Sequence, residues 1–522
     1  MLIRSTKPRL LPVGRLPDLS KSFFSLKSFF RLKVLRRPPQ AVDRGQMSPV
    51  SIGGIWAARL VTALRLGWMV VSLAMGIASS PLSAWAIEAP PAEAAGAGSS
   101  RPGDREELHG ALSEAKELPE AQLRGEGLAV AEWVRQLGGQ VLVERVEDRV
   151  FVVAVNLSGT PISDADLLRL SGLGGLRRLW LGGTAITDIG LTILNDFGSL
   201  EELSLAHTGV TDAGLPLLAF LPRLRKLSLE GTRITDAGIE FWAECAHPYI
   251  PFRLEDLSLA RTQVGDRALA ALSRFSRLRV LDLKFTAVTD GGLPHLAKLS
   301  HLQSVNLVGT KVTDEALAAL VSQLPLEELY APPGTGPVTL GRLAEGGRLK
   351  FLSLMGTGVT DEALAAVGKL TALRGLALGG TAVADRGLRF LEGLKELEFL
   401  DLTGTRLTEE GLASLGHCQK LKVLELRETQ VGDGFVDQLV GLSSLEALGL
   451  ARTKVTGRGL GKLSQLENLQ HLVLRGNSLE EEVVGELSQL KQLQTLDVAQ
   501  TGLQPEAISA IKKALPQTRV IY

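Results

Sequence analysis

The sequence predicts an α/β repeat fold: a solenoid with a parallel sheet on its concave side, short helices on its convex side and a cap at each end. Three observations support this. The pattern L-x-x-L-x-L recurs through most of the 522 residues, its copies mostly start 24 residues apart, and most continue with T-x-[IV]-T-D-x-G-L-x-x-L. The apolar spacing thus changes from that of a strand to that of a helix. A fixed period in this range indicates stacked repeats rather than several separate cores.

One copy, residues 176–197, shows how a repeat is built. Leu179 and Leu181 alternate with other residues and predict a short strand that turns its leucines inward. Thr187 and Asp188 stand where the helical spacing begins, so we expect one of them to cap a short helix, and Asp188 also suits the helix dipole. Because the core lies between neighbouring copies, no copy should fold alone.

The first position of the pattern occurs fifteen times. It falls at Val152, Leu176, Leu200, Leu224, Leu254, Leu278, Leu302, Leu326, Leu349, Leu373, Leu397, Leu421, Leu445, Leu469 and Leu493. Two copies are irregular: residues 246–253 hold an insertion, and residues 331–337, APPGTGP, replace the T-x-[IV]-T-D half. Insertions in solenoids map to loops that can bind partners, but they can equally be neutral changes in a tolerant loop. Both interpretations stay open.

The repeats, residues 152–515, are flanked by expected caps. A helix over 128–137 and strands over 141–146 and 149–157 predict a helix-hairpin cap in residues 109–151, which would close the open sheet edge and the exposed end of the core. A last strand in residues 516–522 is a plausible cap at the other end.

The N-terminal residues have a different composition. Residues 1–46 hold eleven Lys or Arg and two Asp or Glu, and we interpret them as disordered or as an over-called extension. Residues 47–86 resemble a signal peptide that starts at Met47 and ends in an A-x-A cleavage pattern; an uncleaved membrane anchor over residues 66–87 is the alternative. An Ala/Pro/Gly-rich linker follows over 87–108. Either interpretation predicts export, to the periplasm, the cell envelope or the medium, or anchoring by one N-terminal helix.

Charge and motifs exclude several function classes. Beyond residue 86 the chain holds 44 Lys or Arg and 55 Asp or Glu, an excess of eleven acids that argues against nucleic-acid binding. One Asp recurs beside each expected helix start, whereas a calcium loop needs several oxygen ligands within one short segment. None of the seven His stands in a zinc or hydrolase motif. The sequence therefore predicts no metal, no cofactor and no catalytic residue.

The repeat pattern resembles leucine-rich repeats over about residues 152–515. Its T-D-x-G-L half resembles the cysteine-containing subtype of F-box proteins, with Cys245 and Cys418 at the cysteine's place, and we expect both thiols to be buried and to resist alkylation until the protein unfolds. The run of 24-residue copies behind a signal peptide is similar to exported bacterial leucine-rich repeat proteins. The resemblance implies a right-handed horseshoe and a protein-binding scaffold. Alternatives are a substrate-recognition adaptor, as in ubiquitin ligases, and, less favoured, a cell-envelope hydrolase.

The candidate binding residues lie between the inward leucines, on the expected concave face. The partner would be a protein or, less favoured, a glycan, and aromatic and Arg side chains anchor such interfaces most often. The candidates are Arg178, Trp180, His207, Phe285, Tyr330, Phe351, Phe399, Arg427 and Arg452. Phe351 and Phe399 take the same offset in their copies, separated by Gly375 alone, and are therefore expected to form a patch.

Overall fold

The computed structural model describes residues 126–146, 149–245 and 253–522. The basic segment 1–46, the predicted signal peptide or anchor 47–86, the linker 87–108 and nearly all of the insertion at 246–253 lie outside these ranges. Within them, the structure contains no helix that combines the length and the apolar character needed to span a bilayer.

The described strands form one open sheet of 17 strands. Strand β1 (Gln140–Val146) pairs antiparallel with β2 (Arg149–Asn156), and from β2 onward each strand pairs in parallel with the strand of the next copy. The others are β3 (Arg178–Trp180), β4 (Glu202–Ser204), β5 (Lys226–Ser228), β6 (Asp256–Ser258), β7 (Val280–Asp282), β8 (Ser304–Asn306), β9 (Glu328–Tyr330), β10 (Phe351–Ser353), β11 (Gly375–Ala377), β12 (Phe399–Asp401), β13 (Val423–Glu425), β14 (Ala447–Gly449), β15 (His471–Val473), β16 (Thr495–Asp497) and β17 (Arg519–Ile521).

Short α-helices and 3-10 helices (labelled η) alternate with these strands. They are α4 (Glu126–Gln136), η3 (Asp164–Leu170), α5 (Asp188–Leu194), α6 (Leu215–Leu218), α7 (Asp236–Glu244), α8 (Asp266–Leu272), α9 (Leu293–Leu296), α10 (Asp314–Val321), α11 (Pro337–Gly346), η4 (Asp361–Ala363), α12 (Leu364–Val367), α13 (Asp385–Leu388), η5 (Arg389–Gly393), α14 (Glu409–Leu412), η6 (Ala413–His417), η7 (Asp433–Phe435), α15 (Val436–Leu439), η8 (Leu460–Gln465), α16 (Val483–Leu487) and α17 (Pro505–Ala514).

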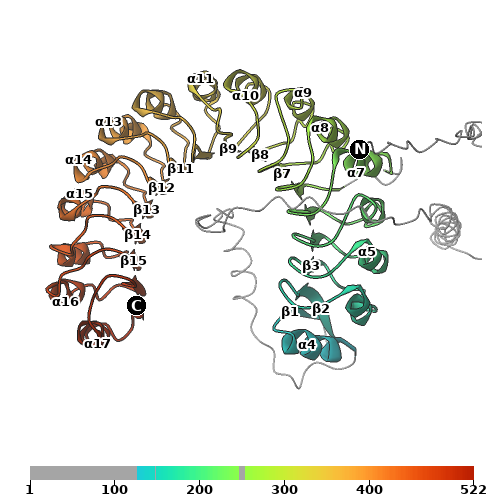
Figure 1. Cartoon of the computed structure of the whole chain (residues 1–522), viewed down its shortest axis with the longest axis horizontal. Helices are drawn as coiled ribbons and strands as arrows, with labels where there is room; N and C mark the ends of the chain where they lie inside the picture. The colour runs from blue at the N-terminus through green and yellow to red at the C-terminus, as the bar shows by residue number, and fades with distance from the viewer. Residues whose placement is uncertain (1–125, 147–148, 246–252) are drawn as a thin grey trace, which may run out of the picture. The chain divides into compact units, whose positions relative to one another are not determined.

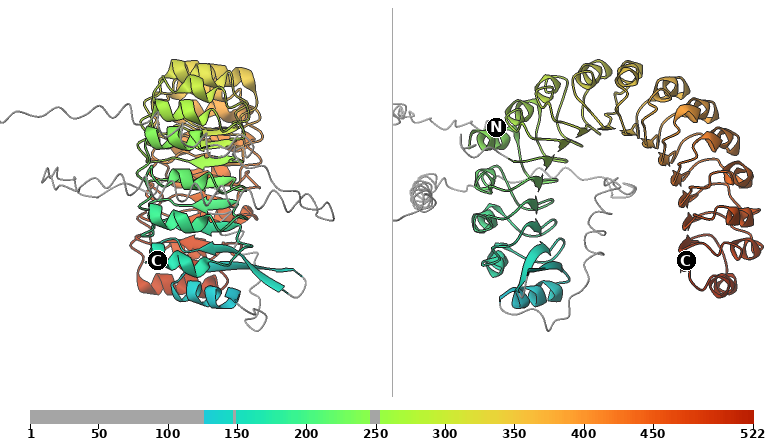
Figure 2. Two further views of the ribbon diagram at one scale, coloured as in Figure 1. Left: turned by 90° about the vertical axis from the view of Figure 1, so that its right-hand side faces the viewer. Right: turned by 180° about the vertical axis from the view of Figure 1, so that it is seen from behind.

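Strands and helices occupy opposite sides of the repeat unit. The strands line the inner side of an open arc and the helices its outer side (Figures 1 and 2). This arrangement confirms the predicted fold class. The helix α4 and the β1–β2 hairpin stand at the N-terminal end of the repeats, and β17 pairs with β16 at the other end.

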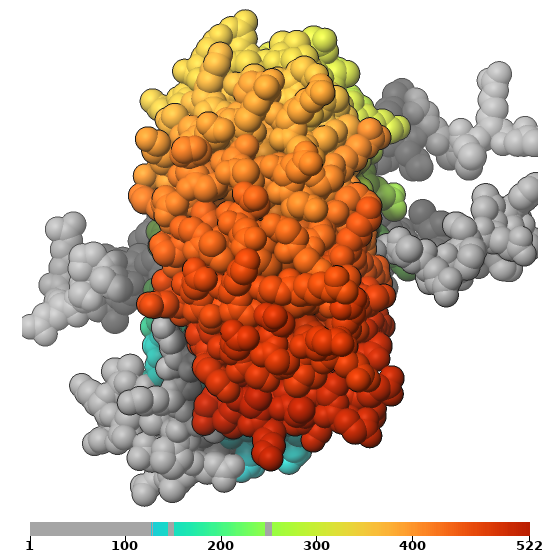
Figure 3. Space-filling view, turned by 90° about the vertical axis from the view of Figure 1, so that its left-hand side faces the viewer, coloured from blue at the N-terminus to red at the C-terminus, as the bar shows by residue number. Residues whose placement is uncertain are grey.

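The core is a stack of leucines between the two sides. The middle residue of each strand from β3 to β16 is buried, as the nearly inaccessible Leu179, Leu376 and Leu400 illustrate. Burying one such side chain stabilises the fold by about 1.5–3 kcal/mol. In the copies coloured orange to red, successive repeats lie against one another as a continuous block (Figure 3).

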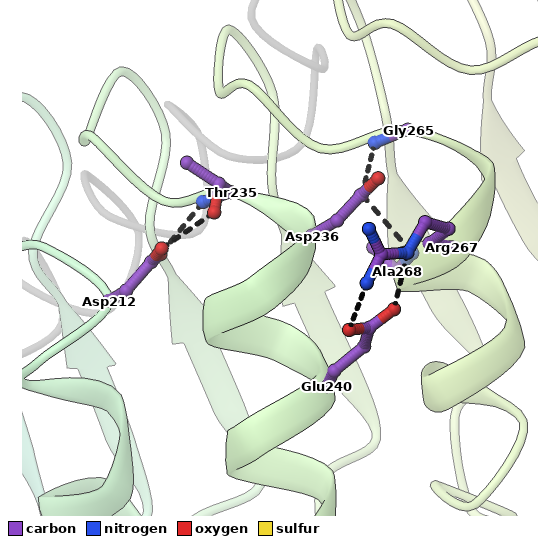
Figure 4. Close-up of polar contacts among 7 residues, drawn as sticks. All are labelled: Asp212, Thr235, Asp236, Glu240, Gly265, Arg267 and Ala268. Atoms are coloured by element: carbon purple, nitrogen blue, oxygen red, sulfur yellow. Dashed lines mark hydrogen bonds and ion pairs between the residues drawn. The ribbon is translucent and has the colours of Figure 1, made fainter. Parts of the chain in front are cut away.

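The Asp that recurs beside many of the helix starts connects neighbouring copies. The carboxylate of Asp164 accepts a 2.8 Å hydrogen bond from the backbone N–H of Thr187 and a 2.6 Å bond from its hydroxyl, in the following copy. Asp212 binds Thr235 in the same way, and Asp236 accepts from the N–H groups of Gly265 and Ala268 (Figure 4). The expectation that Thr187 or Asp188 caps the short helix is confirmed for Thr187, whose hydroxyl accepts from the N–H of Ile189. Asp188 instead accepts from Thr211 in the following copy.

The glycine of T-D-x-G makes room for this carboxylate. A Cβ atom added to Gly190 would stand 2.5 Å from Oδ1 of Asp164, and one added to Gly387 would stand 2.5 Å from Oδ1 of Asp361. Asp and Gly in successive copies are thus parts of one contact, which we call the Asp–Thr–Gly link. It holds copies in register on the helix side, as strand pairing does on the other.

The irregular segment 331–337 is partly buried against the repeats. Ala331 and Thr335 are buried, and Pro337 begins α11 at the position that Asp takes elsewhere, so the link to the next copy is missing there. The preceding Asp314 still accepts from the N–H groups of Gly336, Val338 and Thr339. Burial alone would raise the pKa of Asp314, but these bonds and the Thr339 side chain outweigh it and hold that pKa below its usual value.

The two cysteines differ in their surroundings. Cys418 is buried, its thiol faces the carbonyl of Leu391, and burial raises its pKa to about 11. Cys245 is only partly buried at the end of α7, so its predicted core placement is wrong, although burial and then the Glu244 charge raise its pKa too.

We expect the two thiols to react with iodoacetamide at different rates in the native protein. Cys245 should be modified slowly but measurably at neutral pH, and faster as rising pH increases its thiolate fraction. Cys418 should react only after denaturation, since it is both buried and protonated. Mass spectrometry of each site over time measures both rates. Equal rates at the two cysteines in native protein would contradict this assignment.

Candidate binding surface on the concave sheet

The first and third residues of each strand point away from the leucine core. We call these positions the strand face; β2 contributes Ala154 and Asn156, as its pairing with β3 shows. Across β2 to β17 the strand face carries seven acidic residues: Glu202, Asp256, Asp282, Glu328, Asp401, Glu425 and Asp497. It carries three basic ones, Arg178, Lys226 and Arg519. Seven minus three leaves four excess negative charges at these positions.

Three aromatic side chains form a row on the strand face. The ring centroids of Tyr330 and Phe351 are 5.1 Å apart, and those of Phe351 and Phe399 are 6.2 Å apart. The Phe351 ring lies over Gly375, on the strand between them, where any Cβ atom would collide with it. The expected proximity of Phe351 and Phe399 is confirmed. All three side chains are partly exposed, and together they are the aromatic row.

Trp180 does not share this exposure. It points to the concave side, but only 8% of it is accessible, and its indole N–H donates a 2.9 Å hydrogen bond to Glu202. Arg178 lies 5.9 Å from its ring centre and covers it further. The expectation of an exposed indole is wrong because a large ring beside the small Ser204 lies down on the sheet and is covered by its neighbours.

Three other predicted residues occupy a strained backbone position just after the strands. His207, Phe285 and Arg452 have φ of 55°, 55° and 54°, the left-handed region in which eight other copies place glycine. Such a conformation costs about 1–2 kcal/mol for a residue with a side chain. The exposed Phe285 ring lies between the guanidinium of Arg261 and the ammonium of Lys284, 4.8 and 5.5 Å from its centre.

Charged side chains along the neighbouring edge are largely paired. Glu327 with Lys350 and Glu398 with Lys422 approach to 2.6 and 2.9 Å. The predicted residue Arg427 is exposed and pairs with Glu425 at 3.1 Å. Exposed pairs of this kind contribute little to stability, about 0–1 kcal/mol. They do partly cancel the positive charge beside the aromatic row.

An open groove of about 990 Å³ runs along this face and brings several predicted residues together. Its lining includes Arg178, Tyr330, Phe351 and Phe399, whereas His207, Phe285, Arg427 and Arg452 are not among the lining residues. Glu425 was missed by the sequence reasoning, although it takes the same offset as Asp401 one copy later. Among the described residues, no group of three or more His, Cys, Asp or Glu is arranged to hold a metal ion.

Two stretches of the chain match known family models. Residues 350–519 match the model of a leucine-rich repeat region, and residues 298–321 match that of a single leucine-rich repeat. The copies within these two ranges are leucine-rich repeats. No curated protein matches the chain by sequence.

Solved leucine-rich repeat structures are similar to the chain at low identity. An internalin from Listeria monocytogenes is 22% identical, with 71% of this chain and 94% of that one covered and a TM-score of 0.40. A leucine-rich repeat protein of Leptospira interrogans is 19% identical, with 68% and 80% covered and a TM-score of 0.39. The ectodomain of the receptor kinase GASSHO1/SCHENGEN3 from Arabidopsis thaliana, in complex with CASPARIAN STRIP INTEGRITY FACTOR 2, is 16% identical, with 73% and 57% covered and a TM-score of 0.38.

Proposed function

We propose that this protein is an exported or membrane-anchored scaffold that binds a partner protein reversibly on the concave face of its leucine-rich repeats. The observation that carries the proposal is the aromatic row. Tyr330, Phe351 and Phe399 lie in a row across four strands, and the Phe351 ring takes the space over Gly375 on the strand between the two phenylalanines. Aromatic side chains supply much of the binding energy of protein interfaces.

Export is the second part of the proposal. It is supported by the uncharged run 66–87 and the A-x-A pattern that follows its core. An exported protein would meet its partner in the cell envelope or the medium. A substrate-recognition adaptor, the alternative function, would instead need a cytoplasmic partner. N-terminal sequencing of the mature protein tests this part, and a start upstream of Met47 would contradict cleavage from that methionine.

Replacing two rings of the aromatic row tests the binding surface. The full-length protein is immobilised and cell-envelope proteins of the source organism are passed over it. The affinity of each recovered protein is then measured for the wild type and for the Phe351→Ala/Phe399→Ala double variant. We expect the double variant to bind at least about thirtyfold more weakly, since each buried aromatic anchor contributes roughly 1–2 kcal/mol or more.

A matched pair of phenylalanines on the convex side provides the control. Phe220 and Phe241 are 50% and 48% exposed, and the Phe220→Ala/Phe241→Ala variant should bind as the wild type does. Equal affinities of the two double variants would refute the aromatic row as the binding surface. Binding that survives proteolysis of the envelope fraction but not removal of its polysaccharide would assign a glycan partner instead.

A further inference from the structure

A basic patch lies where the chain leaves strands β5 to β8. In each of these copies, four residues lead from the inward leucine after the strand to the next inward Ile or Val. We call these residues, 230–233, 260–263, 284–287 and 308–311, the exit rim. The exit rim carries one acid, Glu230, and four basic residues: Arg233, Arg261, Lys284 and Lys311. Four minus one leaves three excess positive charges, although the chain beyond residue 86 is acidic overall.

The nearest carboxylates neutralise this charge only in part. Oε1 of Glu230 lies 3.6 Å from Nε of Arg261 and 3.9 Å from Nε2 of His207, so one carboxylate is shared by two side chains. On the strand face, Asp282 accepts a 3.0 Å hydrogen bond from the N–H of Lys284. Counting Asp282 as well still leaves two excess positive charges, which an arriving anion would meet.

The outer two cations of the exit rim are exposed. Arg233 and Lys311 form no ion pair with any residue that the structure describes. The aspartates of the Asp–Thr–Gly link follow the residues whose backbones pair with these two positions. Their carboxylates are nevertheless directed to threonines, since Asp212 and Asp290 each accept two hydrogen bonds from one threonine.

An exposed aromatic ring stands in the same patch. Phe285 is 46% exposed, and its ring takes the space over Gly309 of the next copy, where any Cβ atom would collide with it. The guanidinium of Arg261 lies over this ring, 4.8 Å from its centre, and the ammonium of Lys284 lies 5.5 Å from it. The 3.6 Å approach of Arg261 to Glu230 is too long for a hydrogen bond. The guanidinium therefore keeps N–H donors for a ligand.

The backbone of the patch is strained where the fold does not require it. Arg261 and Phe285 have φ of 56° and 55°, in the left-handed region. The copies on either side place Gly231 and Gly309 at this position, with φ of 66° and 72°, and glycine adopts such angles without steric cost. Large side chains kept at a strained position indicate that the side chains themselves have a function.

We propose that the exit rim binds an acidic segment of a partner protein in which an apolar residue stands among the acids. Carboxylates of the segment pair with Arg261 and Lys284, and the apolar residue covers Phe285. Arginine holds a carboxylate through two N–H groups at once, and aromatic and Arg side chains anchor interfaces. The lining of the concave groove includes none of these three residues, so this second surface does not depend on the aromatic row.

Three fluorescein-labelled peptides test the chemistry of the ligand on the full-length protein. The first repeats Glu-Leu-Glu-Ser, the second carries Lys in place of each Glu, and the third carries Ala in place of each Leu. Fluorescence anisotropy at low and high ionic strength measures their affinities. We expect the Glu-Leu peptide to bind most tightly and to lose affinity as salt rises, because salt screens its charges. It should exceed the Glu-Ala peptide at both salt concentrations, because Leu buries apolar surface on the ring.

Two arginine variants with the same change in net charge locate the contact. Arg261→Ala should weaken binding of the Glu-Leu peptide about tenfold. Arg406→Ala is the matched control, since Arg406 is an exposed arginine after β12 that forms no ion pair with a described residue. It should leave the affinity unchanged. Any binding of the peptide to the basic residues 1–46 is the same in both variants and cancels in their comparison.

Phe285→Gly tests whether the ring serves binding or folding. Glycine adopts a φ of 55° without strain, so the unfolding temperature should equal or exceed that of the wild type. The affinity for the Glu-Leu peptide should nevertheless fall about tenfold, because the apolar contact is lost. A lower unfolding temperature with unchanged affinity would assign the ring to the fold and overturn the inference.

The remaining outcomes separate the acidic segment from other occupants of the exit rim. Equal affinities of Arg261→Ala and Arg406→Ala, or a preference for the Lys peptide, overturn the inference. Self-association that Arg261→Ala abolishes would assign the rim to acids of a second copy, and phosphatidylglycerol vesicles that bind in place of the peptide would assign it to a lipid surface. Both results also overturn it. The proposed function is tested separately, by the Phe351→Ala/Phe399→Ala variant.

Discussion

Leu400→Ala is expected to lower the free energy of unfolding by about 2–5 kcal/mol. Leu400 is the inward residue of β12 and is fully buried, between Leu376 and Leu424 on the adjoining strands. Its truncation opens a cavity in a stack where each copy is supported only by its neighbours. Because Phe399 and Asp401 flank it, the same change should also weaken partner binding.

Urea unfolding of the full-length chain, followed by circular dichroism, measures this effect. Leu168→Ala is the control, since Leu168 is an exposed leucine of η3, and its removal should change stability by less than about 0.5 kcal/mol. Similar stability losses for the two variants would contradict the assigned register. A solenoid can unfold in more than one step. The stability change of each variant is therefore taken from the unfolding transition of the repeats that contain the substituted residue.

Gly190→Ala is expected to destabilise the protein by about 2–3 kcal/mol, although Gly→Ala inside a helix normally stabilises by roughly 0.5–1 kcal/mol. The added methyl group would stand 2.5 Å from Oδ1 of Asp164 and 3.0 Å from Cδ1 of Leu167. The carboxylate must move, and both hydrogen bonds that Thr187 donates to Asp164 are weakened or lost. The reversed sign is therefore specific to the Asp–Thr–Gly link.

Gly341→Ala is the matched control for this prediction. Gly341 lies inside α11, and a Cβ atom there would have no heavy atom within 4 Å. We expect it to stabilise by the ordinary helix-propensity amount. Thermal unfolding of both variants decides the matter: a Gly190→Ala variant as stable as Gly341→Ala would show that the link contributes nothing.

The repeat fold was predictable because its signal is periodic. Leu179 and its equivalents recur at one spacing, and only an inward strand position satisfies that spacing in every copy. The role of Asp164 was not predictable from one copy, since its partner Thr187 lies in the next copy and both residues also suit a helix cap. Comparing Asp in one copy with Gly in the following copy would have suggested the link.

The sequence predicts which side chains face the concave side, but not how exposed each of them is. The register places Trp180 and Phe351 on the same face, yet Trp180 is covered while Phe351 is partly exposed. The difference depends on neighbouring strands: Glu202 accepts the Trp180 N–H, whereas Gly375 lets the Phe351 ring lie toward Phe399. Side-chain orientation across strands is set by such neighbours, which the pattern of one copy does not contain.

Hydroxyl-radical footprinting of the protein with and without its recovered partner tests the central claim most directly. The oxidation rates of individual side chains report which surface becomes covered. Covering of the concave face predicts slower oxidation of Phe351, Met355 and Phe399, with unchanged rates at the convex residues Phe220 and Phe241. Protection of Phe220 and Phe241, with Phe351 and Phe399 oxidised as fast as in the free protein, would contradict the concave face as the binding surface.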